Sequence, residues 1–266
     1  MPTCPASRAL RRQLLPLLAA FIAALSTPCL ARGAVPDLRP RAEPARADSF
    51  EAAYRRWGRP YRRSLLATKK GRGEKTKIPL EASREAWYEL LDLYLAIPPA
   101  EFAEDPQWHT DLATITGRLH LGEWLVYAGD RDRAYEALEP VRHIWLRIRE
   151  RNGVRWFGDE LTRYYDVIEP VVLWGTGETH GGVTPENVAE FEDEVETLAS
   201  AWQTVRSFRY RPVARRDQRR FPRFMAREAT ALRSLQAAAA ARQYDQIAEA
   251  SLEVRNAFLP IFIWFD

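Results

Sequence analysis

The chain has 266 residues, 46% of them hydrophobic, so it is long enough to bury one large core or two small ones. Both cysteines, Cys4 and Cys29, lie in a predicted export signal, and the rest of the chain therefore has no thiol for a disulfide, a nucleophile, a cysteine-ligated metal or a covalently attached haem. Three of the 39 basic residues lie in that signal, and none of the 36 acidic residues does, so the rest of the chain has equal numbers of basic and acidic residues. The isoelectric point of about 8.9 therefore gives no reason to expect nucleic-acid binding.

Residues 1–31 have the features of a secretory signal peptide. Three arginines, Arg8, Arg11 and Arg12, precede the apolar run 14–25, which is too short to span a bilayer. We expect cleavage near Ala31 and a periplasmic or secreted mature chain without a transmembrane segment. Residues 32–46 are rich in Pro, Ala and Arg, a composition typical of a disordered tether.

Residues 47–175 are predicted to form an N-terminal helical bundle. Apolar residues recur there at helical spacing in five segments, at about 49–66, 81–96, 108–128, 132–151 and 159–174. Pro60 lies inside the first of these helices, which we expect to be bent or split, and Pro140 and Pro170 lie inside later ones, where we expect kinks. Gly129 and Asp130 predict a tight turn, with the glycine ending one helix and Asp130 or Asp132 capping the next.

A glycine-rich segment, residues 175–182, is predicted to link this bundle to a C-terminal helical half, residues 183–266. Helical spacing continues in that half over about 184–206, 221–242 and 244–262. The sequence contains no useful run with the two-residue period of a strand. We therefore predict an all-α fold.

An internal repeat suggests how the helices are organised. Residues 132–148 and 245–261 agree at several positions when shifted by 113, at helical spacing. The matched pairs are Asp132/Asp245, Glu136/Glu249, Ala137/Ala250, Val141/Val254, Arg142/Arg255, Leu146/Leu259 and Ile148/Ile261. The pattern favours one amphipathic core helix used twice, hence a duplicated bundle of the four-helix type.

The second copy resembles the last helix of the cytochrome c′ family of periplasmic four-helix bundles. That helix carries a valine followed by a Cys-x-x-Cys-His haem-attachment motif, and the register places Val254 before Phe258, Ile261 and Phe262. Apolar side chains thus replace both cysteines and the haem-ligating histidine. The resemblance implies the fold, with the haem lost and its volume filled.

A second resemblance gives an alternative fold. The residues Leu121-Gly122, Gly129-Asp130 and Ala134 are similar to the skeleton of a tetratricopeptide repeat, in which two closely crossing helices need small residues at their contact. This resemblance implies a helical-repeat scaffold for protein interactions. The alternative is that any tight helical hairpin requires the same residues.

Histidine and acidic side chains offer a candidate metal site. His120 and Glu123 lie three residues apart on one predicted helix, and Glu169 lies at the boundary of the apolar face of another. Bundles can build carboxylate–histidine sites from such residues, so a transition metal is a possible cofactor; otherwise none is predicted. Further residues of suitable type are predicted to face water: Glu139, His143 and Asp166.

Residues 206–227 contain nine arginines interleaved with aromatic residues. In an exported protein this pattern suggests a surface for an anion or a partner, such as an anionic envelope component. The candidate residues are Arg209, Arg211, Arg215, Arg216, Arg219, Arg220 and Arg223. The alternative that we favour from sequence is internal neutralisation by the acidic residues of 186–196.

The sequence contains no nucleophile elbow, and residues 175–182 lack the Lys-Ser/Thr of a phosphate-binding loop. We therefore expect an exported, non-catalytic protein that binds an unknown protein or small ligand, or has a structural role. The alternatives are a metal-binding or redox bundle and a tetratricopeptide-like scaffold.

Overall fold

The computed structural model describes residues 49–70, 74–210, 212 and 215–264. The predicted signal, the predicted tether and Arg211 lie outside the described residues. Residues 46–266 make one compact unit, within which all of the following contacts lie.

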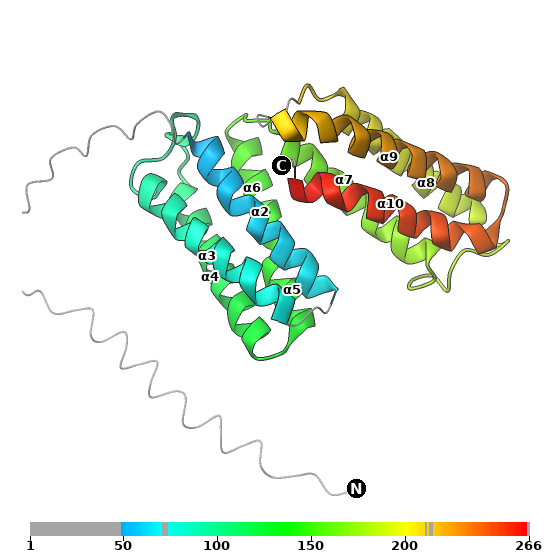
Figure 1. Cartoon of the computed structure of the whole chain (residues 1–266), viewed down its shortest axis with the longest axis horizontal. Helices are drawn as coiled ribbons and strands as arrows, with labels where there is room; N and C mark the ends of the chain where they lie inside the picture. Colours follow the sequence, from blue (N-terminus) through cyan, green and yellow to red (C-terminus); the bar gives the residue numbers. More distant parts are fainter. Residues whose placement is uncertain (1–48, 71–73, 211, 213–214, 265–266) are drawn as a thin grey trace, which may run out of the picture. The chain divides into compact units, whose positions relative to one another are not determined.

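The described chain is all-α and contains no strand, which confirms the predicted fold class (Figure 1). A short 3-10 helix, Ala100–Phe102, precedes α4. The α-helices are α2 (Phe50–Lys69), α3 (Glu74–Tyr94), α4 (Trp108–Tyr127), α5 (Arg131–Leu138), α6 (Pro140–Arg151), α7 (Phe157–Gly175), α8 (Val188–Ser207), α9 (Arg215–Ala240) and α10 (Tyr244–Trp264). None of these helices is both long and apolar enough to cross a membrane.

The internal prolines have different effects on their helices. Pro140 separates α5 from α6, because it has no N–H to donate to the carbonyl four residues earlier. α2 and α7 continue across Pro60 and Pro170, so neither helix is split. The turn between α4 and α5 is as predicted: Gly129 has a φ of 81°, and the Asp130 carboxylate accepts a hydrogen bond from the Arg133 N–H at 3.3 Å.

The helices form two separate hydrophobic cores. The first lies among α2–α6 and contains fully buried indole rings, and the second lies among α7–α10, with Leu66 of α2 at its edge. The buried tryptophans of the first core are Trp57, Trp87, Trp108 and Trp145. α7 thus packs with the C-terminal helices, whereas the sequence suggested grouping it with the N-terminal ones. Its apolar face fits either partner, so periodicity alone does not distinguish them.

The two copies of the repeat occupy comparable positions in the two cores. The first copy spans α5 and α6 and the second lies in α10, so each contributes the last helical segment of its own core. Val141 and Val254 are both completely buried, and Asp132 and Asp245 are both exposed. The burial pattern agrees with a duplicated unit, which stays a prediction.

Candidate functional sites

The structure does not bring the predicted metal ligands His120, Glu123 and Glu169 together. The first two lie on α4 beside α3, whereas Glu169 lies on α7 beside α2. Each is bound by a different neighbour: the His120 Nε2 lies 2.6 Å from the Tyr88 hydroxyl, Glu123 pairs with Arg84, and Glu169 pairs with Lys69. The position of a residue on its own helix does not show which neighbouring helix that face meets.

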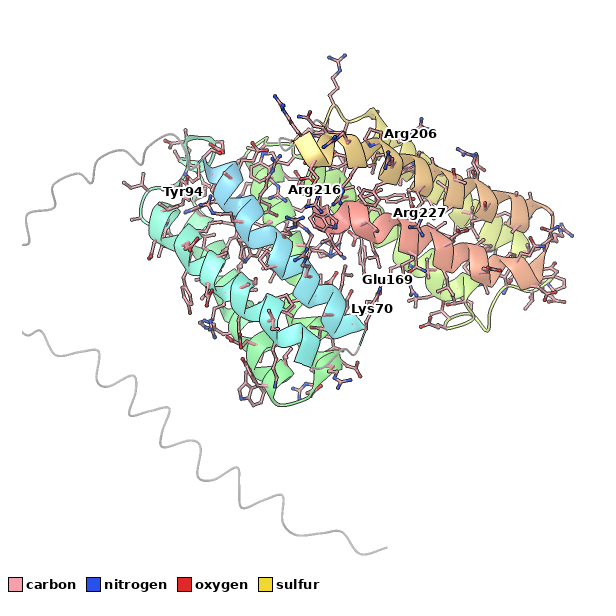
Figure 2. All side chains as sticks on the ribbon, viewed as in Figure 1. Lys70, Tyr94, Glu169, Arg206, Arg216 and Arg227 are labelled. Atoms are coloured by element: carbon pink, nitrogen blue, oxygen red, sulfur yellow. The ribbon has the colours of Figure 1, made fainter. Side chains whose placement is uncertain are left out.

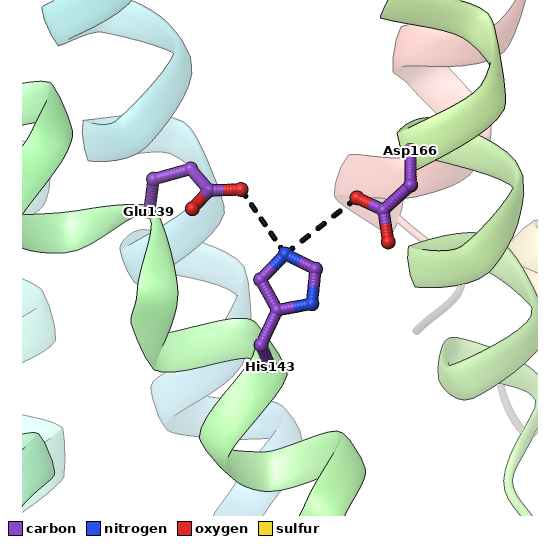
Figure 3. Close-up of side chains that lie close together, drawn as sticks. All are labelled: Glu139, His143 and Asp166. Carbon is purple, nitrogen blue, oxygen red and sulfur yellow. Dashed lines mark hydrogen bonds and ion pairs between the residues drawn. The ribbon is translucent and has the colours of Figure 1, made fainter.

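Instead, a different group converges where α6 meets α7 (Figure 3). The Nε2 atom of His143 lies 3.2 Å from the Glu139 Oε1 and 3.6 Å from the Asp166 Oδ1. Among the described residues, this is the group of histidine and carboxylate side chains whose ligand atoms lie close enough together to hold a metal ion. The sequence predicted that all three face water, because each was judged against the apolar stripe of its own helix. Asp166 is exposed, as predicted, whereas Glu139 and His143 are partly buried where the two helices meet.

Arg142 determines the chemistry of this cluster. Its Nη2 donates to the Asp166 Oδ1 at 2.6 Å and also contacts Glu139, while its Nη1 donates to the Thr162 carbonyl at 3.2 Å. The Arg142 side chain is only 6% exposed. Burial by itself raises the pKa of Glu139, but the hydrogen bond with His143 and the charge of Arg142 outweigh it and bring that pKa to about 2.

A divalent cation bound by both carboxylates would lie close to the Arg142 guanidinium. Two unit charges about 4 Å apart repel by about 4 kcal/mol at an effective dielectric constant of about 20, and a divalent ion doubles this. Arg142 already supplies the positive charge that the two carboxylates need. The cluster is therefore best described as an ion-pair network that joins α6 to α7.

The arginine-rich segment lies on α9 and the chain before it. We call the described members of the predicted set the arginine surface: Arg209, Arg215, Arg216, Arg219, Arg220 and Arg223. All are exposed except Arg220, which is partly buried. The side-chain view shows Arg206, Arg216 and Arg227 along this part of the molecule (Figure 2). α9 begins at Arg215, earlier than predicted, so most of these arginines are helical.

The favoured sequence interpretation, neutralisation by the acidic residues of 186–196, is contradicted. α8 and α9 are antiparallel, so the acidic start of α8 lies beside the alanine-rich end of α9 (Figure 1). The arginines lie beside the other end of α8. Within the described ranges, no ion pair joins an acidic residue of α8 to an arginine of this surface.

Positive charge also accumulates on α2 beside the start of α9. The Arg59 guanidinium stacks 3.4 Å from the centroid of the Trp264 ring, and the Arg63 guanidinium lies 5.2 Å from it. Burial lowers the pKa of Arg59, and repulsion from Arg63 and Arg216 lowers it further, against an opposing attraction by Asp217. Arg216 thus belongs to a region where cations outnumber anions.

A buried carboxyl group that the sequence analysis missed lies in the second core. Glu228 of α9 is 0% exposed, and its Oε1 accepts a hydrogen bond from the Tyr164 hydroxyl at 2.7 Å. Burial raises the pKa of Glu228 to about 8, although the Tyr164 bond and the charge of Arg227 oppose this. The sequence could have indicated this burial, because the spacing from Leu232 and Leu235 places Glu228 within the apolar stripe of its helix.

Comparison with protein families, curated proteins and solved structures finds no match to this chain.

Proposed function

We propose that the mature chain is an exported, non-catalytic helical protein whose arginine surface binds an acidic partner. One observation carries the proposal: the arginines at the start of α9 are exposed and outnumber Asp217 beside them, while the acidic residues of 186–196 belong to the other end of the α8–α9 pair. Exposed like charges repel one another, so the binding of an anionic partner that neutralises them is favourable. Export rests on the sequence of residues 1–31.

Two further features support a binding role without a prosthetic group. At the positions where the cytochrome c′ resemblance would require haem attachment, Phe258, Ile261 and Phe262 are buried in the second core. The histidine of the α6–α7 network faces carboxylates that a buried arginine already neutralises. The space that a haem would need is thus filled, and the carboxylates beside His143 already have a cationic partner.

The proposal is tested with poly-L-glutamate as the acidic probe. We expect the purified mature chain to bind it at low ionic strength, with affinity falling as salt rises, because exposed charges are screened beyond about 8 Å at physiological ionic strength. The variant Arg216→Gln/Arg219→Gln should bind at least about tenfold more weakly. The matched control, Arg147→Gln/Arg233→Gln, removes two exposed arginines outside the surface and should bind like the parent.

Vesicles that contain phosphatidylglycerol form the second arm of this experiment. Binding to vesicles but not to poly-L-glutamate would replace an acidic protein by a lipid surface as the partner. Equal binding by the two double variants would refute the role of the arginine surface.

A further inference from the structure

The exposed large hydrophobic side chains of the described chain lie on one helix pair and its connection. They belong to α3, α4 and the segment that joins them: Ile78, Tyr88, Leu95, Ile97, Leu121, Trp124 and Tyr127. Trp124 is 64% exposed, which is unusual for the largest apolar side chain. Exposed apolar side chains gathered in one place mark an interaction site more often than isolated ones do.

Acidic residues share this region. At 100° per residue, one side of α3 carries Glu81, Glu85, Glu89 and Asp92 within a sector that ends at Tyr88. Glu85, Glu89 and Asp92 are exposed. We call Glu81, Glu85, Tyr88, Glu89 and Asp92, together with Leu121, Trp124 and Tyr127 of α4, the acidic aromatic face.

Hydrogen bonds between the two helices make this face continuous. The Tyr127 hydroxyl donates to the Glu81 carboxylate at 2.6 Å, and the Tyr88 hydroxyl lies 2.6 Å from the His120 Nε2. The Tyr127 ring of α4 is thereby held beside a carboxylate of α3, and the Tyr88 ring of α3 is held beside His120 of α4. Such a combination suits arginine, whose guanidinium pairs with carboxylates and stacks on indole or phenol rings.

We propose that a second copy of this chain docks its arginine surface on the acidic aromatic face. This inference names the partner of the arginine surface and therefore rests on the proposed function. The two surfaces are complementary in charge, and both lie on the same chain. Among the described residues no ion pair connects α3 or α4 with the arginines of α9, so neither surface satisfies the other within one molecule.

The contact joins two different surfaces, so it is heterologous. Each copy that docks leaves one arginine surface and one acidic aromatic face free at the ends of the assembly. Association therefore continues beyond a dimer as concentration rises, unless the rotation between copies closes a ring. Screening by salt weakens it, because its charges are exposed before contact.

Sedimentation velocity of the purified mature chain tests this proposal. We expect species larger than a monomer that grow with concentration at about 50 mM NaCl and revert to monomers at about 500 mM. Two variants should associate at least about tenfold more weakly, namely Glu85→Gln/Glu89→Gln and Arg216→Gln/Arg219→Gln. The control Glu190→Gln/Glu194→Gln removes two exposed acidic residues of α8 at the same four-residue spacing and should associate like the parent.

Mixing the two variants gives the sharpest result. One retains only the arginine surface and the other only the acidic aromatic face, so together they rebuild a single contact. We expect a one-to-one heterodimer that does not grow. Adding Trp124→Ala to Arg216→Gln/Arg219→Gln, the variant that retains the acidic aromatic face, should abolish that heterodimer.

The outcomes separate this inference from the proposed function. A parent chain that is monomeric at every concentration but binds poly-L-glutamate through the arginine surface overturns the self-association and leaves the proposed function standing. Self-association that both double variants retain also overturns it. A monomer that does not bind the probe overturns both.

Discussion

The buried carboxyl group of Glu228 makes the stability of this protein depend on pH in a definite direction. Its pKa is about 8 in the folded protein, against an ordinary value of 4.5. Between these values the folded protein holds a proton that the unfolded chain has released. The free energy of unfolding therefore falls by about 1.4 kcal/mol for each pH unit from 4.5 to 8, about 5 kcal/mol in all.

Glu228→Gln removes this dependence. The glutamine carbonyl oxygen can accept the Tyr164 hydrogen bond as the protonated carboxyl does, and it never ionises. We expect the variant to resemble the parent near pH 5 and to be more stable near pH 9. Below pH 4.5 both states of the parent are protonated at this position, so Glu228 contributes no slope there.

Urea unfolding followed by tryptophan fluorescence at pH values between 5 and 9 measures this difference. The quantity to compare is the slope of the unfolding free energy against pH for the parent and for Glu228→Gln, measured at high salt to suppress association. Equal slopes would show that Glu228 is not the titrating group, and the reasoning from burial would fail.

Two further predictions concern the N-terminal helices and the α6–α7 network. Gly122→Ala should destabilise the protein by about 1–3 kcal/mol, because the new Cβ would lie 2.5 Å from the Leu138 side chain. At Gly117 a Cβ would meet nothing within 4 Å, so Gly117→Ala should be neutral or stabilising. The midpoints of urea unfolding measure both effects. Glu139, with a pKa of about 2, should contribute up to about 3 kcal/mol above pH 4.5 that is lost as pH falls towards 2, so Glu139→Gln should flatten acid unfolding in that window. An unchanged acid profile would contradict the assigned pairing with Arg142.

The sequence predicted those features that depend on neighbours along the chain. The repeat placed Val141 and Val254 on core faces, and both are buried. Gly129 predicted a turn that needs a positive φ, and Pro140 predicted a kink, where the structure has the break between α5 and α6. Helical spacing, turn chemistry and proline geometry operate within a few residues, so a linear sequence contains them in full.

Only the tertiary structure decided which faces meet. An apolar stripe does not name its partner, so the packing of α7 with α8–α10 could not be predicted from its spacing. The same holds for Asp166, whose partners His143 and Arg142 lie on another helix, and for the antiparallel α8–α9 pair that separates acidic residues from arginines. Charges act through space, and their neighbours are fixed by how helices pack rather than by their order in the chain.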